Sequence, residues 1–197
     1  MCFINLGAYV MRKYFFFTIA AILFSGVCCA NDSKLFVEDV VHEALGVVNG
    51  SDSDETKRSK LSASINKYVD IKWLSGKVFG GLGYNDLVDS DKSRVEAYLK
   101  NYLLKFYAGE GKLSAMVGAK LLPINDRDIE LDEKQNKVKT KFSKNTGSKP
   151  YEITWVINGK NILYVEIEGI SQLITLRSEM KAAVKNGLME FIAASGF

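Results

Sequence analysis

The sequence has almost no thiol or imidazole chemistry. Its three cysteines, Cys2, Cys28 and Cys29, all lie within the first 30 residues, and His42 is its one histidine. A chain that loses this leader keeps no cysteine, so it cannot form a disulfide and must be stabilised by packing. One histidine without any cysteine is also too small a ligand set for a zinc, copper or haem site. We therefore expect no metal cofactor.

A strong charge of one sign is also missing. The whole chain has 26 basic and 23 acidic residues. Residues 1–30 contain two of the basic residues, Arg12 and Lys13, so their removal leaves 24 basic against 23 acidic residues, a net charge of +1. Proteins dedicated to nucleic acids usually concentrate positive charge. No nucleic-acid partner is therefore expected.

The first 30 residues have the pattern of a secretory signal peptide. Arg12-Lys13 forms a short positive region, Tyr14–Val27 is an uncharged apolar run, and the small residue Ala30 ends the segment. We expect cleavage near Ala30, with translation starting at Met11. Residues 31–197 then remain as one domain, long enough to bury a hydrophobic core.

Two other interpretations of this leader stay open. An uncleaved Tyr14–Ala30 segment would tether the protein to a membrane, although a membrane span needs ~20 apolar residues. A lipidated Cys28 would also anchor it, although Val27 is a poor residue to precede a lipidated cysteine. The N-terminal residue of the exported protein separates the three cases.

Helical patterns dominate the first half of residues 31–197. Apolar residues recur at helical spacing after Ser33, which can cap a first helix that Asn49-Gly50 ends. Two further helices are expected over Thr56–Val69 and Ile71–Phe79. The longest helix is expected to begin at Asp89 or Ser90 and to end near Gly109 or Gly111. It has a continuous apolar face rich in aromatic side chains: Val95, Tyr98, Leu99, Tyr102, Leu103 and Phe106.

Strand patterns follow. Apolar and polar residues alternate over Val138–Phe142 and again over Tyr151–Ile157, which is the period of a half-buried strand. Asn158-Gly159 predicts a type I′ hairpin turn, because both residues tolerate a positive φ. That turn would lead into a third long strand over Lys160–Glu168. Helices, then antiparallel strands, then helices predict an α+β fold with a sheet of about four strands.

The hairpin leaves its own faces undecided. With a plain two-residue turn, Ile153 and Trp155 lie on the face opposite to Val165 and Ile167. Both faces would then be partly apolar, and helices would have to cover both. A bulge in one strand would instead bring the four side chains to one face.

Several polar clusters favour structural interpretations. The run Asp52–Glu55 lacks the glycine and glutamate that a calcium loop needs, since Lys57 and Ala63 stand at those places. The run Gly80–Gly83 follows a helix and lacks the Gly-Lys-Ser/Thr of a phosphate loop. His42 lies off the apolar stripe of its helix, as a solvated histidine does. A lysine cluster is more typical of the outward face of a strand than of a headgroup site: Lys134, Lys137, Lys139, Lys141, Lys144 and Lys149.

Short motifs give the chain a family resemblance. The strand-to-helix segment Tyr164–Phe191 contains Glu168-Gly169-Ile170-Ser171 and then Gly187-Leu188. Upstream, Tyr68-Val69-Asp70-Ile71 precedes an apolar helix that ends in Val78-Phe79-Gly80. In this order and spacing the motifs resemble those of the MlaC-type periplasmic phospholipid-binding proteins, the toluene-tolerance auxiliary proteins of ABC transporters.

The resemblance implies a fold and a function. It implies a curved sheet and helices that enclose an apolar cavity, in a periplasmic, monomeric carrier without a cofactor. Its cargo would be phospholipid. Its partners would be an inner-membrane ABC transporter with an MCE-domain ring and an outer-membrane lipoprotein complex. The lipid-binding residues that it implies are Leu74, Val78, Tyr102, Leu103, Phe106, Ile153, Trp155, Val165, Ile167, Ile170 and Leu173. Arg177 is a candidate contact for the headgroup or a partner.

Two other function classes remain open beside this one. An enzyme on a similar cone-shaped α+β scaffold would need a buried carboxyl group with a raised pKa, and Asp70 and Glu166 are its candidates. Asp70 is also placed to cap a helix. The second class is an interaction protein tethered by an uncleaved Tyr14–Ala30 segment.

Overall fold

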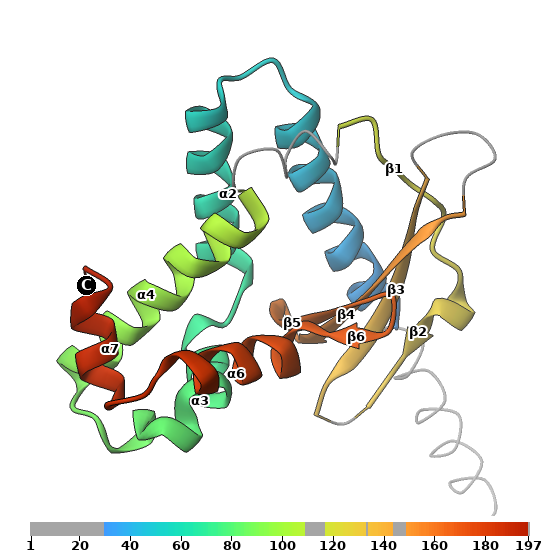
Figure 1. Cartoon of the computed structure of the whole chain (residues 1–197). Coiled ribbons are helices and arrows are strands. Elements are labelled where there is room, and N and C mark those ends of the chain that lie inside the picture. The colour runs from blue at the N-terminus through green and yellow to red at the C-terminus, as the bar shows by residue number, and fades with distance from the viewer. Residues whose placement is uncertain (1–29, 109–116, 133, 144–148, 197) are drawn as a thin grey trace, which may run out of the picture.

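The structure, a computed structural model, describes residues 30–108, 117–132, 134–143 and 149–196 (Figure 1). All of the expected signal peptide except Ala30 lies outside these residues. The helices of the first half are residues 30–49, α2 (Asp54–Tyr68), α3 (Ile71–Phe79) and α4 (Asp89–Ala108), with 3-10 turns η1 (Gly80–Leu82) and η2 (Tyr84–Asp86). The second half contains β1 (Lys120–Leu121), η3 (Asp126–Asp128), β2 (Ile129–Glu130), β3 (Asn136–Ser143), β4 (Tyr151–Asn158), β5 (Asn161–Ile167), β6 (Ile170–Ser171), α6 (Gln172–Ala183) and α7 (Leu188–Ala194).

The α+β class is confirmed. The strands form one antiparallel sheet in the order β1-β3-β4-β5-β6, and β2 also pairs with β3. Within the described residues the sheet therefore has six strands, where about four were predicted. The additional strands are two residues long, which is too short to show a period of two in the sequence.

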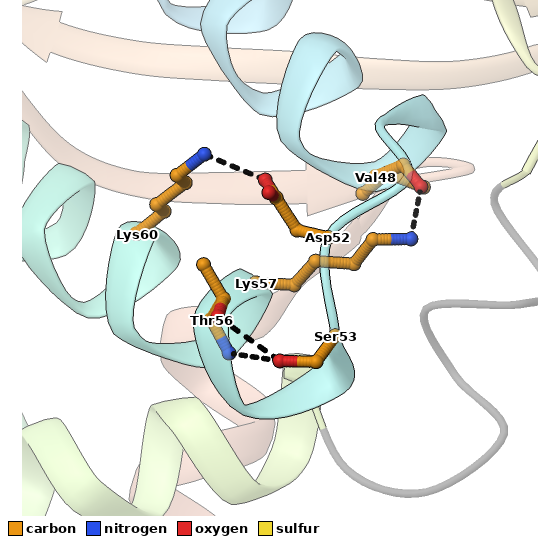
Figure 2. Close-up of polar contacts among 6 residues, drawn as sticks. All are labelled: Val48, Asp52, Ser53, Thr56, Lys57 and Lys60. Atoms are coloured by element: carbon orange, nitrogen blue, oxygen red, sulfur yellow. Dashed lines mark hydrogen bonds and ion pairs between the residues drawn. The ribbon is translucent and has the colours of Figure 1, made fainter.

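The turn before α2 is held by polar side chains (Figure 2). Ser53 caps α2, since its Oγ accepts a hydrogen bond of 3.3 Å from the Thr56 amide. Lys57 Nζ donates to the Val48 carbonyl at 3.0 Å, which satisfies a free carbonyl near the end of the first helix. Asp52 pairs with Lys60 at 2.6 Å. The acidic run that could suggest calcium is thus a polar turn with a cap and an ion pair.

Helix α3 begins and ends at the residues that the sequence predicts. Helix α3 spans Ile71–Phe79, and Asp70 caps it by accepting a 2.9 Å hydrogen bond from the Trp73 amide. The glycines that follow form η1, and Gly83 has a φ of +91°, which glycine adopts readily. Ser171 takes the N-cap position of α6, but its side chain makes no capping hydrogen bond. A serine at this position can cap a helix, but here the chain enters α6 without a side-chain cap.

The hairpin turn lies one residue later than predicted. Asn158 pairs with Asn161, so Gly159 and Lys160 form the turn, and only Gly159 has a positive φ (+56°). The predicted type I′ turn at Asn158-Gly159 is therefore wrong. A glycine with positive φ at the first turn position is the pattern of a type II′ turn.

A bulge in β5 settles which side chains share a face. The register shifts between Val156, which pairs with Tyr164, and Ile157, which pairs with Ile162. Leu163 is the extra residue that is skipped. The two sets that a plain turn would separate, Ile153 with Trp155 and Val165 with Ile167, therefore lie on one face of the sheet.

Among the described residues, two large hydrophobic clusters stabilise the domain, and Val48 with Leu61 forms a third, small one. In the sheet core, valines of the first helix, such as Val37 and Val41, pack against strand residues such as Val138 and Ile157. The helical core joins α3, α4, α6 and α7, which gather beside the sheet in Figure 1: Leu74, Val78, Phe79, Tyr84, Val95, Leu99, Leu176, Met180, Leu188 and Ile192. Val69, between α2 and α3, packs against both clusters. The lipid-binding set implied by the family resemblance is divided between them, except for Phe106, Ile167 and Ile170, which belong to neither cluster.

Polar contacts of Glu43 connect the first helix to α2, and we call Glu43, Ser64, Lys67 and Tyr68 together the polar clasp. Glu43 accepts hydrogen bonds from the Ser64 hydroxyl at 2.6 Å and from the Tyr68 hydroxyl at 2.7 Å, and it pairs with Lys67 at 3.2 Å. Chiefly through the Ser64 and Tyr68 hydroxyls, these contacts lower the pKa of Glu43 from 4.5 to about 2, against a smaller opposing effect of desolvation. The polar clasp therefore requires an ionised carboxylate.

We expect Glu43→Gln to remove an acid-sensitive part of the stability. Because folding lowers the pKa of Glu43, its stabilisation is complete above pH 4.5 and is lost as the pH falls toward 2. The side chain is 37% exposed, so solvent screening should leave about 1 kcal/mol. Urea unfolding across this pH range should show the variant less stable at pH 7, with the gap closing in acid. Glu38→Gln on the same helix is the control, and a gap that persists at low pH would contradict the prediction.

Candidate functional site

One face of the sheet gathers apolar side chains from four neighbouring strands. Cross-strand pairing places Val138 opposite Trp155, and Trp155 opposite Val165. A second row runs through Thr140, Ile153, Ile167 and Ile170, each paired with the next. We call these residues together the apolar sheet face: Val138, Thr140, Ile153, Trp155, Val165, Ile167 and Ile170.

The apolar sheet face becomes more exposed toward one edge. In its second row Thr140 is fully buried, Ile153 and Ile167 are half-buried, and Ile170 on the edge strand β6 is 63% exposed. One turn into α6, which continues directly from β6 (Figure 1), Ile174 is 67% exposed. Large apolar side chains left half in water are unfavourable unless something else covers them. The face is therefore able to take up apolar ligand surface, and its open edge is at β6.

A buried hydroxyl fixes the aromatic member of this face. Trp155 Nε1 donates a 2.9 Å hydrogen bond to Thr140 Oγ1, which itself donates to the Ile153 carbonyl at 3.1 Å. The indole is thereby held in one orientation within a half-buried apolar surface. Thr140 was not among the predicted site residues, although a threonine at an inward position of an apolar-lysine alternation was a usable signal.

We expect Thr140→Val to loosen this indole. The substitution keeps the shape of the side chain but leaves the Trp155 N–H without its acceptor, which costs about 1–2 kcal/mol when the donor is shielded from water. Urea unfolding should show that loss, and tryptophan emission should shift. Thr175→Val is the control, because the Thr175 hydroxyl donates a local hydrogen bond to the carbonyl of Ser171, the N-cap residue of α6. Equal effects of the two substitutions would contradict the prediction.

The helical members of the predicted site lie in and around the helical core. Leu74 and Val78 are buried within it, and Tyr102, Leu103 and Leu173 pack against it half-buried. Phe106, near the end of α4, is 37% exposed and stacks on Tyr102 with ring centroids 6.3 Å apart. The structure thus places five of the predicted residues on the apolar sheet face and six beside the helical core.

The opposite face of the sheet is a ladder of charge pairs. Three β3 lysines face acidic partners: Lys137 lies 3.9 Å from Glu166, Lys139 3.3 Å from Glu152, and Lys141 3.7 Å from Asp128. Lys149 also lies 3.9 Å from Glu168, and Lys144 lies outside the described residues. The described part of the lysine cluster is therefore largely compensated, as expected of an outward-facing strand.

The two carboxyl groups considered for an enzyme lie away from the apolar sheet face. Asp70 caps α3 through Trp73, and Glu166 lies on the charged face opposite Thr154. In the part of the chain that the structure describes, no cluster of three or more histidine, cysteine or acidic residues is placed to hold a metal ion. No helix in that part is both long enough and apolar enough to cross a membrane.

Comparison with known proteins identifies the family. The profile of a family described as MlaC protein matches residues 38–194. The chain belongs to the MlaC family. No curated protein sequence matches it. Among solved structures, it is similar to one described as the phospholipid-binding protein from Ralstonia solanacearum in complex with a phospholipid. The TM-score is 0.65 with 15% sequence identity, over 82% of this chain and 94% of that one.

These comparisons confirm the resemblance that the short motifs predicted. The matched residues include every member of the apolar sheet face and both upstream motifs. At 15% identity, the likeness to the Ralstonia protein establishes a shared MlaC-type fold.

Proposed function

We propose that this MlaC-family protein is a periplasmic phospholipid carrier. The observation that carries the proposal is the apolar sheet face, which is buried at β3, half-buried at β4 and β5 and open at β6, in a fold that the Ralstonia phospholipid-binding protein shares. The acyl chains would lie against Ile153, Trp155, Val165 and Ile167 and leave past Ile170. The half-buried helical residues would cover them from the other side: Tyr102, Leu103, Phe106 and Leu173. Leu74 and Val78 would support that cover from within the helical core.

The physical task of such a carrier is to keep acyl chains out of water. Each buried methylene contributes ~0.8 kcal/mol, so two long tails supply roughly 20 kcal/mol or more of transfer free energy. The same free energy opposes release into water, so a carrier needs partners that receive the lipid directly. An inner-membrane transporter with an MCE-domain ring and an outer-membrane lipoprotein complex are the partners that we propose. No bond is made or broken, so no enzymatic residue is required.

The headgroup would stay near solvent at the open edge. Binding would then depend on the tails more than on headgroup chemistry. Arg177 of α6 is exposed, and its guanidinium lies next to Gly81 of η1, a place from which it can meet a phosphate or a partner. Export through a cleaved signal peptide ending near Ala30 would bring the mature domain, residues 31–197, to the periplasm as a monomer.

Native mass spectrometry of the protein purified without detergent tests the proposal. We expect a bound mass that corresponds to a diacyl phospholipid, and solvent extraction should recover that lipid. A protein that arrives empty, and that takes up no phospholipid from vesicles, would overturn the carrier function. The same spectra give the N-terminal residue and the number of protein copies, and so test cleavage near Ala30 and the monomeric state.

A further inference from the structure

A hollow lies against α3, and none of the residues that line it belongs to the apolar sheet face. It has a volume of about 440 Å³ and is lined by residues of α3, of η2 and of the first turn of α4. Trp73, in its wall, stacks on Tyr164 with ring centroids 6.4 Å apart. Tyr164 pairs with Val156, which pairs with Lys137, so it belongs to the charged face of the sheet. The hollow, which we call the α3 notch, is thus separate from the proposed lipid site.

Positive charge predominates in the α3 notch. Lys72 and Lys77 of α3 and Lys92 of α4 line it, against a single acidic side chain, Asp89. Within the described residues, none of the three lysines has an acidic partner within ion-pair distance, which sets them apart from the compensated lysines of β3. Lys77 Nζ lies 5.5 Å from the centre of the Trp73 ring, a cation–π contact that limits its motion. The concave walls of a cleft lined by one sign of charge strengthen the electrostatic potential inside it.

A glycine keeps the notch open. Gly76 lies inside α3, where glycine is less favourable than alanine by about 1 kcal/mol. A Cβ built on Gly76 would meet only Tyr84 Cε1, at 3.9 Å, so packing does not demand glycine there. A longer side chain at this position would instead project into the volume that the lysines surround.

We propose that the α3 notch binds a phosphate group. Three separate ammonium groups can approach a tetrahedral phosphate from different directions, and lysine commonly binds phosphate as a point charge. Lys92 lies in the first turn of the long helix α4, where the positive end of the helix dipole favours a bound anion. The volume is within the ~300–1,000 Å³ range of small-ligand pockets. The phosphate would belong either to a small soluble phosphate compound or to an anionic phospholipid headgroup at a membrane surface.

Two binding measurements on the purified protein distinguish these sources. In the first, inorganic phosphate and glycerol phosphate are titrated while the indole N–H signal of Trp73 is followed by NMR. In the second, the protein is sedimented with phosphatidylcholine vesicles with and without phosphatidylglycerol. Saturable binding in solution without vesicle binding assigns the site to a soluble compound. Binding to the phosphatidylglycerol vesicles that Ile153→Lys retains assigns it to a headgroup, because that substitution is directed at the proposed lipid site.

Two variants decide whether the α3 notch is responsible. The triple substitution K72Q/K77Q/K92Q should weaken binding by about tenfold or more, since hydrogen bonds to charged groups are strong. The control K160Q/K181Q/K185Q removes the same charge from exposed lysines elsewhere and should change binding by less than about twofold. Gly76→Met should block the notch without changing charge, while Gly76→Ala should not. Equal losses in the two triple variants, or no phosphate binding in either measurement, would overturn the proposal.

Discussion

The protein with Ile153→Lys is expected to be folded and free of phospholipid. Ile153 lies in the middle of the apolar sheet face, between Thr140 and Ile167, where the proposed acyl chains would cover it. An ammonium group there must either lose water when a lipid binds or hold the chains away, and desolvating a charge costs several kcal/mol. We expect phospholipid retention to fall by about 100-fold, which corresponds to ~3 kcal/mol.

The neighbouring residue provides the control for this prediction. Thr154 is the next residue in β4 but lies on the charged face, between Lys139 and Glu166. Thr154→Lys therefore introduces the same charge into the same strand, on the face that we do not propose for lipid. Native mass spectrometry should find phospholipid on this variant and none on Ile153→Lys. Equal lipid content in two variants that both melt cooperatively would remove the apolar sheet face from the proposed site.

A third variant separates the loss of lipid binding from a loss of stability. Ile153 packs half-buried against the sheet core, so the lysine at this position will lower stability, although its stem can lie along the apolar surface with the charge in water. Ile167→Lys places the charge on the next strand of the same row, nearer the exposed edge. It should give the same loss of lipid with a smaller fall in melting temperature.

Local signals predicted the helices and long strands well. Helix α3 has both of its boundaries where they were predicted, because Asp70 supplies a cap and Gly80 a stop. The long helix α4 begins at Asp89 as predicted, and β3 follows from its strict alternation of lysine with apolar residues. These features depend on side chains a few residues apart, which a sequence displays directly.

The bulge and the division into two cores could not be predicted in the same way. Ile162-Leu163-Tyr164-Val165 is continuously apolar, so no polar residue marks where the alternation changes phase. The skipped Leu163 nevertheless decides that Trp155 and Val165 share a face. The packing partners of Leu74 and Val78 could not be predicted either. A helix stripe shows which side is buried, but the neighbours of α3 depend on how distant segments pack.

Phe79→Ala should have the largest effect on stability, and Phe106→Ala should separate folding from lipid uptake. Phe79 is completely buried and meets Tyr98 edge to face with ring centroids 6.4 Å apart, so its truncation leaves a cavity and should cost about 3–5 kcal/mol. Phe106, on α4, is 37% exposed, so the same truncation should cost about 1 kcal/mol or less.

The two substitutions should therefore rank in opposite order for the loss of unfolding free energy and for the loss of bound lipid. Urea unfolding should rank Phe79→Ala far below Phe106→Ala in free energy of unfolding. Lipid extraction from folded protein, normalised to protein amount, should show the larger loss for Phe106→Ala, because Phe106 is proposed to cover the acyl chains and Phe79 supports the helical core from within. A Phe106→Ala protein that keeps its full lipid content would remove the end of α4 from the proposed site. The apolar sheet face would then be left to hold the chains with the remaining helical residues.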